Sequence, residues 1–309
     1  MGGDVHRAQG PPSLGGRLAS AVVASIAVAP AASTIGAEVS GVDLSADIDD
    51  ELAAEIRAAL DDRGVLVFVG QDSVDDEAQK RIASVWAAPR PHPIVEFLGS
   101  DEVIGVVYND ADHPPAEGGD SKFHTDYSFN PEIPDVAVLR AVVIPPVGGA
   151  TVWSDARAAL ASLDDELVDE LRGRVAHHDM GPRFGVEMEA RFGAELAARI
   201  EARFGAGYRH PIVAVHPRTG DELLFVNAGF TRYVLGLPRA RSDALLSRLL
   251  EAFVDPAMSF SRRWRPGDVA VWDEHRTVHR GPNDFAPHAR KLHRCTAGSR
   301  RPAASTKTA

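Results

Sequence analysis

His124 and Asp126 are a pair of residues whose types and spacing could do chemistry. They lie one residue apart in SKFHTDYSFN, residues 121–130, a run that alternates apolar and polar side chains and therefore predicts a strand. Side chains two residues apart on a strand point to one face, so this imidazole and this carboxylate could bind one metal ion together. The motif alone is weak evidence, because the chain has a second H-x-D at His177 and Asp179.

A metal site built on this pair needs a third ligand, and the late segment WDEHRTVHRG offers His275 and His279. Two histidines and one carboxylate that leave the other positions open form the ligand set of non-haem Fe(II) oxygenases. Zinc is the main competitor for a mixed histidine and aspartate site. The H-x-D at His177 follows a predicted helix and has no glycine-bounded partner strand, so we interpret it as a surface pair or as part of the layer around a site.

Two arginines near the C-terminal end could bind an anion. Arg290 and Arg294 lie four residues apart in HARKLHR, and on a strand this spacing places both on one face. Two guanidiniums on an inward face are costly to bury unless anions neutralise them, and arginine grips a carboxylate through two parallel hydrogen bonds. The other interpretation is that both face water in a basic stretch, and their position alone leaves both interpretations open.

Length, composition and charge restrict the class of protein. The chain has 309 residues, 44% of them hydrophobic and 25% charged, which is typical of a globular protein with a sizeable core. A formal net charge of −11 argues against nucleic acid and anionic membranes as partners, although local arginines still allow a small anionic substrate. One cysteine, Cys295, cannot form an internal disulfide, and its alternating surroundings predict a buried thiol on a strand.

Both ends of the chain are predicted to be flexible. GGRLASAVVASIAVAPAAS has some features of a secretory signal, but Ser25 and Pro30 interrupt its apolar run and it continues into a predicted strand. We therefore predict a flexible segment over 1–33 and a cytoplasmic protein. No stretch is long and apolar enough to cross a membrane. The polar end RPAASTKTA predicts a flexible tail over 298–309.

The predicted elements between these ends form one domain over 34–297. Alternating or apolar runs predict strands before and after a helical stretch, which favours one β-rich domain with a helical insertion at 155–205 over two separate domains. A hairpin is predicted to turn at 218–220. Apolar residues at helical spacing predict helices over 45–64, 75–88, 154–174 (with a break in the middle), 186–205 and 242–255.

The blocks together resemble the taurine dioxygenase (TauD/TfdA) family of Fe(II)- and 2-oxoglutarate-dependent oxygenases over about residues 34–297. The blocks that carry the resemblance are STIGAEVSGVDLS, FHTDYSF, PPVGGATVWSD, HPIVAVHPRTGDELLFVNAGFTR and WRPGDVAVWDEHRTVHRGPNDFAPHARKLHRCT. Their spacing is the specific part: the intervals from Asp126 to Thr151, and from His279 to Arg290 and Arg294, match those of the taurine-type members.

The resemblance implies the fold and the metal site. The fold it implies is mainly β with helical insertions, a double-stranded β-helix of the jelly-roll, cupin-like kind. It implies Fe(II) held by His124, Asp126 and His279, and no catalytic residue beyond these ligands. His275 falls on a position that is not a ligand in the family.

The resemblance also implies sites for 2-oxoglutarate and for the substrate. Thr151 and Arg290 are expected to bind the distal carboxylate of 2-oxoglutarate, and O2 is the other co-substrate. Arg294 is expected to reach the anionic group of the substrate, and His92 falls where taurine-type members place a histidine that helps to bind the sulfonate.

Departures from the taurine-type pattern gather around the predicted substrate site. Phe123 replaces the usual tryptophan, Asp120 replaces an asparagine that contacts the amine of taurine, and Val95 replaces a tyrosine. With Tyr127 and Phe129, Val95 would make the pocket more apolar. The anion-binding end of the pocket is therefore expected to be kept, and the amine-binding end is not.

The expected function is that of a dioxygenase that hydroxylates a C–H bond of a small anionic substrate, yielding succinate and CO2. The substrate could be a sulfonate such as taurine, an alkyl sulfate or a carboxylate, and a biosynthetic tailoring hydroxylase of the same family is an alternative. A non-catalytic cupin-like binding protein is the alternative from another class, and the six matching site residues argue against it. We expect the segment 155–205 to act as a lid, and the protein to be a homo-oligomer, a dimer or a tetramer.

Overall fold

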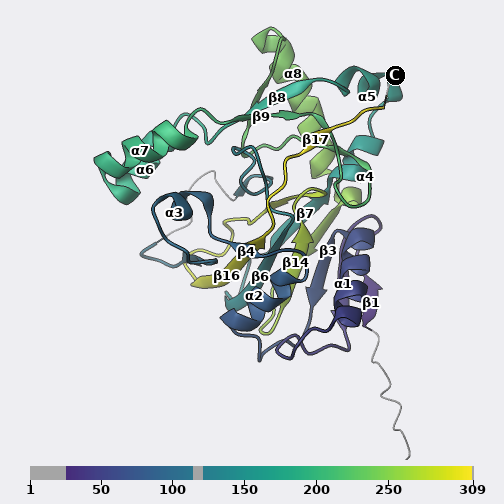
Figure 1. Ribbon diagram of the computed structural model, residues 1–309, viewed down its shortest axis with the longest axis vertical. Helices are drawn as coiled ribbons and strands as arrows, with labels where there is room; N and C mark the ends of the chain where they lie inside the picture. The colour runs from purple at the N-terminus through teal and green to yellow at the C-terminus, as the bar shows by residue number, and fades with distance from the viewer. Residues whose placement is uncertain (1–25, 114–120, 308–309) are drawn as a thin grey trace, which may run out of the picture.

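The alternating and apolar runs of the sequence form two facing β-sheets in the computed structural model, which describes residues 26–113 and 121–307 (Figure 1). In these residues the larger sheet comprises, in spatial order, β1 (Ala27–Pro30), β2 (Ala37–Ser40), β3 (Val65–Phe68), β14 (Val269–Asp273), β6 (Val136–Val143), β16 (Arg290–Ala297) and β4 (Pro89–Arg90), with β5 (Ile104–Asn109) paired to β16. The smaller facing sheet comprises β13 (Ser259–Arg262), β7 (Thr151–Asp155) and β15 (Thr277–Arg280). This arrangement confirms the predicted mainly β, jelly-roll fold.

Large aromatic side chains fill the space between the two sheets. Trp153 of β7 is fully buried, stacks on Phe260 of β13 at 5.8 Å between ring centroids, and meets Trp272 of β14 at 5.7 Å. Replacing one such buried tryptophan by alanine costs about 3–5 kcal/mol. These contacts fix the sheets to each other, and the strands that carry the candidate site residues belong to them.

Two predicted helices cover the outer face of the larger sheet (Figure 1). They are α1 (Asp50–Arg63) and α2 (Asp76–Ser84). Asp49 caps α1 by accepting a hydrogen bond from the backbone N–H of Leu52, and Gly64, at φ 66°, ends it in the left-handed conformation that glycine adopts without strain. Ile56 and Leu60 of α1 are buried against this face.

The predicted helical insertion contains a strand as well as helices. The first predicted helix is broken into α4 (Ala156–Ala161) and α5 (Asp165–Leu171), as expected, and the second is broken at Gly193 into α6 (Phe184–Phe192) and α7 (Ala194–Phe204). Between them lies β8 (Val175–His178), which forms a further sheet with β9 (Tyr208–Pro211) and β12 (Thr231–Val234). In Figure 1 the pair α6–α7 projects from the body of the molecule beside α3 (Pro93–Phe97).

The remaining elements complete the helical side of the molecule. They are the hairpin of β10 (Val213–Val215) and β11 (Glu222–Leu224), the helix α8 (Arg239–Glu251), and 3-10 turns at Ala252–Val254 and Pro256–Met258. The hairpin turn falls where the sequence predicts it. Among the helices of residues 26–113 and 121–307, none has the length and apolar character needed to span a bilayer.

Both segments that the sequence predicts to be flexible contain residues that pair with strands in the structure. Residues 26–33 include β1, which pairs antiparallel with β2, while residues 1–25 lie outside the described residues. At the other end, Arg300 exchanges backbone hydrogen bonds with Ile133, and β17 (Ala303–Ala304) pairs with β10. This segment pairs through its backbone with the edge of an existing strand. Backbone hydrogen bonds do not depend on side-chain type, so the polar composition of the segment does not predict this pairing.

Candidate active site

The backbone of the first and last segments brings two histidines together. The N–H of His124 donates to the carbonyl of His279 at 2.9 Å, and the N–H of His279 donates back at 2.8 Å. The two rings lie 4.2 Å apart between centroids. The strand predicted over 121–130 is therefore wrong beyond this bridge, because the chain turns directly after His124.

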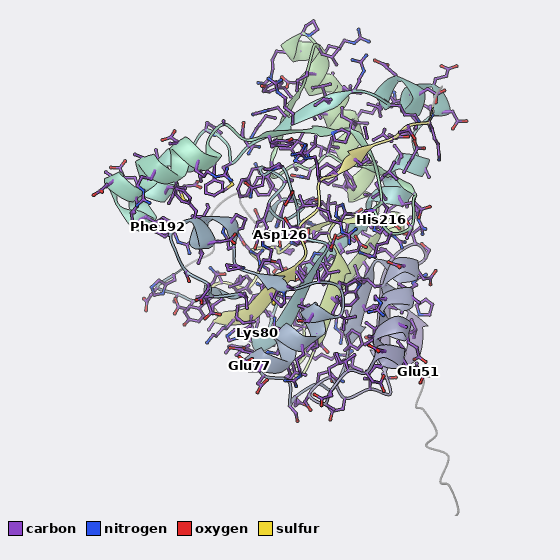
Figure 2. The ribbon with its side chains drawn as sticks, in the orientation of Figure 1. Glu51, Glu77, Lys80, Asp126, Phe192 and His216 are labelled. Carbon is purple, nitrogen blue, oxygen red and sulfur yellow. The ribbon has the colours of Figure 1, made fainter. Side chains whose placement is uncertain are left out.

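Asp126 completes a buried group with these histidines. Its Oδ1 lies 3.7 Å from Nε2 of His124 and 3.9 Å from Nε2 of His279, and all three side chains are buried. In Figure 2 Asp126 lies near the centre of the molecule, between the sheets and the helical side. No other group of three or more potential histidine, cysteine or carboxylate ligands occurs in the described part of the chain.

The three side chains fit a divalent metal. Two imidazoles and one carboxylate, buried and with their donor atoms all within 4.8 Å of one another, would hold a divalent cation such as Fe(II). Nδ1 of His124 lies 2.8 Å from the carbonyl of Lys122, which assigns the proton to Nδ1 and presents Nε2 as the lone-pair atom toward Asp126. His275, the other candidate ligand, lies elsewhere, with its Nε2 3.6 Å from Asp135.

A buried glutamate, Glu274, connects the backbone of Asp126 to the tryptophan that lies beside His279. Oε2 of Glu274 accepts the backbone N–H of Asp126 at 3.0 Å, and Oε1 accepts the indole N–H of Trp272 at 2.7 Å. The ring of Trp272 lies 4.8 Å from that of His279. Burial, and then the charge of Asp126, raise the pKa of Glu274 well above its usual range. Glu274 was not among the residues predicted from the sequence, although a glutamate directly after an apolar strand is a signal for a buried acid.

Arg294 binds the carboxylate of Asp126 in this structure. Its Nη1 donates to both oxygens, at 2.9 and 3.0 Å, and its Nη2 donates to the hydroxyl of Tyr127 at 3.1 Å. Tyr127 has a φ of 58°, which is uncommon for a residue other than glycine and turns its ring toward Arg294. Burial raises the pKa of Tyr127 to about 12, so its hydroxyl stays protonated. The contact of Arg294 with a substrate anion stays a prediction.

Thr151 and Arg290, the residues predicted to bind 2-oxoglutarate, line one cavity with the two histidines. Nη2 of Arg290 lies 3.5 Å from Oγ1 of Thr151, which also accepts the indole N–H of Trp264 at 3.0 Å. A small cavity of about 50 Å³ is lined by His124, His279, Thr151, Arg290, Arg294 and five neighbours. Arg290 and Arg294 of β16 line the same cavity, which supports the inward-facing interpretation over the one in which both face water.

A larger cavity, of about 530 Å³, lies beyond Arg294. Its lining includes the predicted substrate residues His92, Val95 and Tyr127, together with β5 and, from α6, Met188, Arg191 and Phe192. His92 also caps α3, since its Nδ1 accepts the backbone N–H of Ile94 at 3.1 Å. The α6 residues were not predicted from the sequence. Their signal was the apolar spacing of that helix, but spacing does not say which cavity a helix face covers.

Two other predicted substrate residues do not line this cavity. Phe129 is buried in an apolar cluster, 5.5 Å from the ring of Phe230 and 6.0 Å from that of Phe204, so its predicted place in the pocket is wrong. The chain turns after His124, and Phe129 contacts these rings and not the cavity. Asp120 lies outside the described residues.

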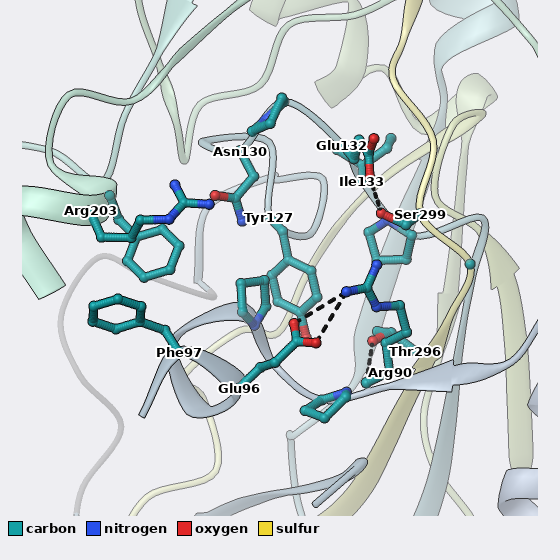
Figure 3. Close-up of a pocket in the computed structure, with 16 residues that line it drawn as sticks. Arg90, Glu96, Phe97, Tyr127, Asn130, Glu132, Ile133, Arg203, Thr296 and Ser299 are labelled. Atoms are coloured by element: carbon teal, nitrogen blue, oxygen red, sulfur yellow. Dashed lines mark hydrogen bonds and ion pairs between the residues drawn. The ribbon is translucent and has the colours of Figure 1, made fainter. Parts of the chain in front are cut away.

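A third cavity, of about 330 Å³, lies on the side of Tyr127 that faces α3 and α7 (Figure 3). Arg90 separates it from the larger cavity and donates to both carboxylate oxygens of Glu96, at 3.1 and 3.3 Å. Arg90, Tyr127 and Thr296 line both cavities. These shared walls place Tyr127 at the junction of the two spaces.

Two buried histidines support the turn that carries Asp126. Nε2 of His210 lies 2.9 Å from the carbonyl oxygens of both Ser128 and Asn130, and therefore carries the proton that it donates to them. Nδ1 of His178 lies 3.3 Å from Oγ of Ser128. Burial lowers the pKa of His210 to about 4 and that of His178 well below 6.5.

These two histidines are expected to make the protein less stable in mild acid. Above pH 6.5 both are neutral in the folded and the unfolded chain. Below pH 6.5 the unfolded chain binds the protons first, because burial lowers the pKa of His210 to about 4 and that of His178 well below its usual value. The free energy of unfolding should therefore decrease as the pH is lowered, by about 1.4 kcal/mol per pH unit for each histidine. Urea unfolding of wild type and His210→Gln from pH 7.5 to 4.5 measures this. The free energy of unfolding of the variant should depend less steeply on pH, by the contribution of one histidine. Equal pH dependence in the two proteins would contradict the prediction.

Comparisons with known proteins place this arrangement among relatives. The family described as "Taurine catabolism dioxygenase TauD, TfdA family" matches residues 27–296. The chain is 31% identical over 267 residues to an alkylsulfatase of Acinetobacter baylyi (85% of this chain, 81% of the relative), and 32% identical over 281 residues to an alpha-ketoglutarate-dependent sulfate ester dioxygenase of Pseudomonas putida (87% and 88%). A crystal structure of a taurine dioxygenase from Burkholderia xenovorans superimposes with a TM-score of 0.75 at 28% identity, covering 91% of this chain and 93% of that one.

Proposed function

Since this chain belongs to the taurine catabolism dioxygenase TauD, TfdA family, we propose that it oxidises a C–H bond of an organic sulfate ester or sulfonate at the site formed by His124, Asp126 and His279. The protein is an Fe(II)- and 2-oxoglutarate-dependent dioxygenase that acts on a small anionic substrate. One observation carries the proposal for its residues: the buried histidines lie in one cavity with Thr151, Arg290 and Arg294, and Arg294 also lines the larger cavity beyond.

The residues divide the work between the two cavities. Arg290 and Thr151 would offer a guanidinium and a hydroxyl to the distal carboxylate of 2-oxoglutarate, in the cavity that the two histidines also line. Arg294 offers its guanidinium to the sulfate or sulfonate of the substrate from the other side. Bound Fe(II), with 2-oxoglutarate and O2, supplies the oxidising power for hydroxylation, with release of succinate and CO2. The chain's own contribution is to position one substrate carbon and to exclude water.

The wall of the larger cavity favours an organic chain over taurine. Val95, Met188 and Phe192 offer an apolar surface, and about 530 Å³ exceeds what a short aminosulfonate needs. Hydroxylation at the carbon that bears the sulfate would give an unstable product. It would break at the C–O bond to the sulfate, so that an aldehyde and inorganic sulfate leave together. The homo-oligomer and the cytoplasmic location expected from the sequence stay predictions.

The test is a panel of anions of matched chain length, read by succinate release. Alkyl sulfates, alkyl sulfonates and alkyl carboxylates of equal length are incubated with Fe(II), 2-oxoglutarate and O2, and the turnover without substrate is subtracted. We expect a sulfate or sulfonate to raise succinate formation at least tenfold over that background, and a sulfate to release inorganic sulfate in equal amount. If carboxylates are preferred at every length, the proposed substrate class is wrong, although the dioxygenase activity stands.

A further inference from the structure

The block LLFVNAGFTR of the sequence has no role in the site described so far. In the structure its central residues, Asn227–Thr231, form a closed turn against the segment that carries His124. The N–H of Thr231 donates to the carbonyl of Asn227 at 3.1 Å, and the N–H of Phe230 donates to Oδ1 of Asn227 at 2.7 Å. The N–H of Gly229 donates across to the carbonyl of Phe123 at 3.0 Å. The turn is therefore both internally bonded and joined to the residue before His124.

Gly229 lies too close to His124 for any side chain. A Cβ built at Gly229 would lie 2.7 Å from Cβ of His124, closer than real carbon atoms approach. The φ of Gly229 is outside the left-handed region, so this position needs glycine for the close approach and not for the backbone angle. His124 cannot simply move away, because its backbone is bonded in both directions to His279.

The same turn also holds the residues after Asp126. Nδ2 of Asn227 donates to Oγ of Ser128 at 3.1 Å, and both residues are fully buried or nearly so. His178 contacts the same Oγ, and His210 contacts the backbone carbonyl of Ser128. The turn thus grips the metal-binding segment on both sides of H-x-D, at Phe123 and at Ser128.

We propose that the turn Asn227–Thr231 positions His124 and Asp126 for metal binding, with Gly229 setting the place of the His124 ring and Asn227 that of the residues after Asp126. This inference rests on the proposed metal site. Gly229 and Asn227 are positioning residues, since they act through the ligands. A ligand set must be held within about 0.5 Å of its productive geometry, so a displacement forced by a single Cβ is enough to weaken it.

The substitution Gly229→Ala tests the proposal through metal affinity. Mn(II) serves as the probe, and its binding is measured from the EPR signal of the free ion, without substrate or turnover. We expect Mn(II) to bind at least about tenfold more weakly than to wild type, which is the range found when groups that orient metal ligands are removed. Near-UV circular dichroism and thermal unfolding of the metal-free protein show whether the variant is folded. A folded Gly229→Ala with Mn(II) affinity within twofold of wild type overturns the proposal.

Two further variants keep the result decisive. Gly173→Ala places a side chain at φ +80° with no atom within 4 Å, so it strains the backbone far from the ligands and should leave Mn(II) affinity unchanged. If it weakens Mn(II) binding as much as Gly229→Ala does, general destabilisation is the cause and the proposal fails.

Ser128→Ala removes the acceptor of Asn227 at small steric cost and tests the role of the turn if Gly229→Ala does not fold. We expect several-fold weaker Mn(II) binding, and an unchanged affinity overturns the proposal. Wild type that binds no Mn(II) would instead refute the proposed metal site itself.

Discussion

Replacing His279 by alanine is expected to abolish 2-oxoglutarate-dependent turnover and to weaken Mn(II) binding by more than about 100-fold. Losing a group that only orients a metal ligand already costs 10–100-fold in affinity, and the loss of a ligand itself should cost more. The substitution removes a buried imidazole whose Nε2 lies 3.9 Å from Asp126, leaving two of the three donors. Mn(II) titration by EPR and succinate release measure the two effects separately.

His275→Gln is the matched control for this prediction. His275 lies four residues earlier and is equally buried, but its Nε2 faces Asp135 at 3.6 Å and not the metal ligands. Glutamine keeps a hydrogen-bond donor for Asp135, so the variant should keep Mn(II) affinity within about threefold of wild type while losing some stability. If His275→Gln loses Mn(II) binding to the same extent as His279→Ala, the assignment of the third ligand is wrong.

The sequence could identify the candidate ligands but not choose between His275 and His279 by periodicity. Residues four apart share a face on a continuous strand, so both histidines fitted the alternation. The structure interrupts the strand: β14 ends at Asp273 and β15 begins at Thr277, so His275 lies in the turn between them. The family resemblance separated the two residues because it compares positions and does not assume a regular backbone.

The misplacement of Phe129 has another origin, because its expected place in the pocket did not depend on strand alternation. On a regular strand Phe129 would face away from His124 and Asp126, since residues an odd number apart lie on opposite faces. The chain instead turns at the left-handed Tyr127, and Phe129 is buried in an apolar cluster. Other features depend on contacts between distant segments, such as the approach of Glu274 to the N–H of Asp126 and the pairing of β17 with β10. Composition and local spacing carry no information about such contacts, whereas the two sheets follow from local apolar patterns.

Arg290→Ala and Arg294→Ala are expected to weaken the binding of different ligands. Removing one partner of a buried charged pair costs about 2–5 kcal/mol, so Arg290→Ala should weaken 2-oxoglutarate binding by at least about 30-fold. Arg294→Ala should raise the KM for the organic anion by a similar factor and change 2-oxoglutarate binding less. Isothermal titration of 2-oxoglutarate into the Mn(II) protein and substrate KM from succinate release measure the two quantities, and each variant is the control for the other.

The contact of Arg294 with Asp126 bears on how Arg294 would bind the organic anion. The guanidinium reaches Asp126 through Nη1 and Tyr127 through Nη2, so a substrate anion must share it or displace one of these contacts. Arg294→Lys keeps a positive charge near Asp126 but offers a single ammonium in place of the planar fork. We therefore expect Arg294→Lys to recover less than half of the binding free energy for the organic anion that Arg294→Ala loses, while 2-oxoglutarate affinity stays near wild type. If Arg294→Ala weakens 2-oxoglutarate more than Arg290→Ala does, the roles of the two arginines must be exchanged.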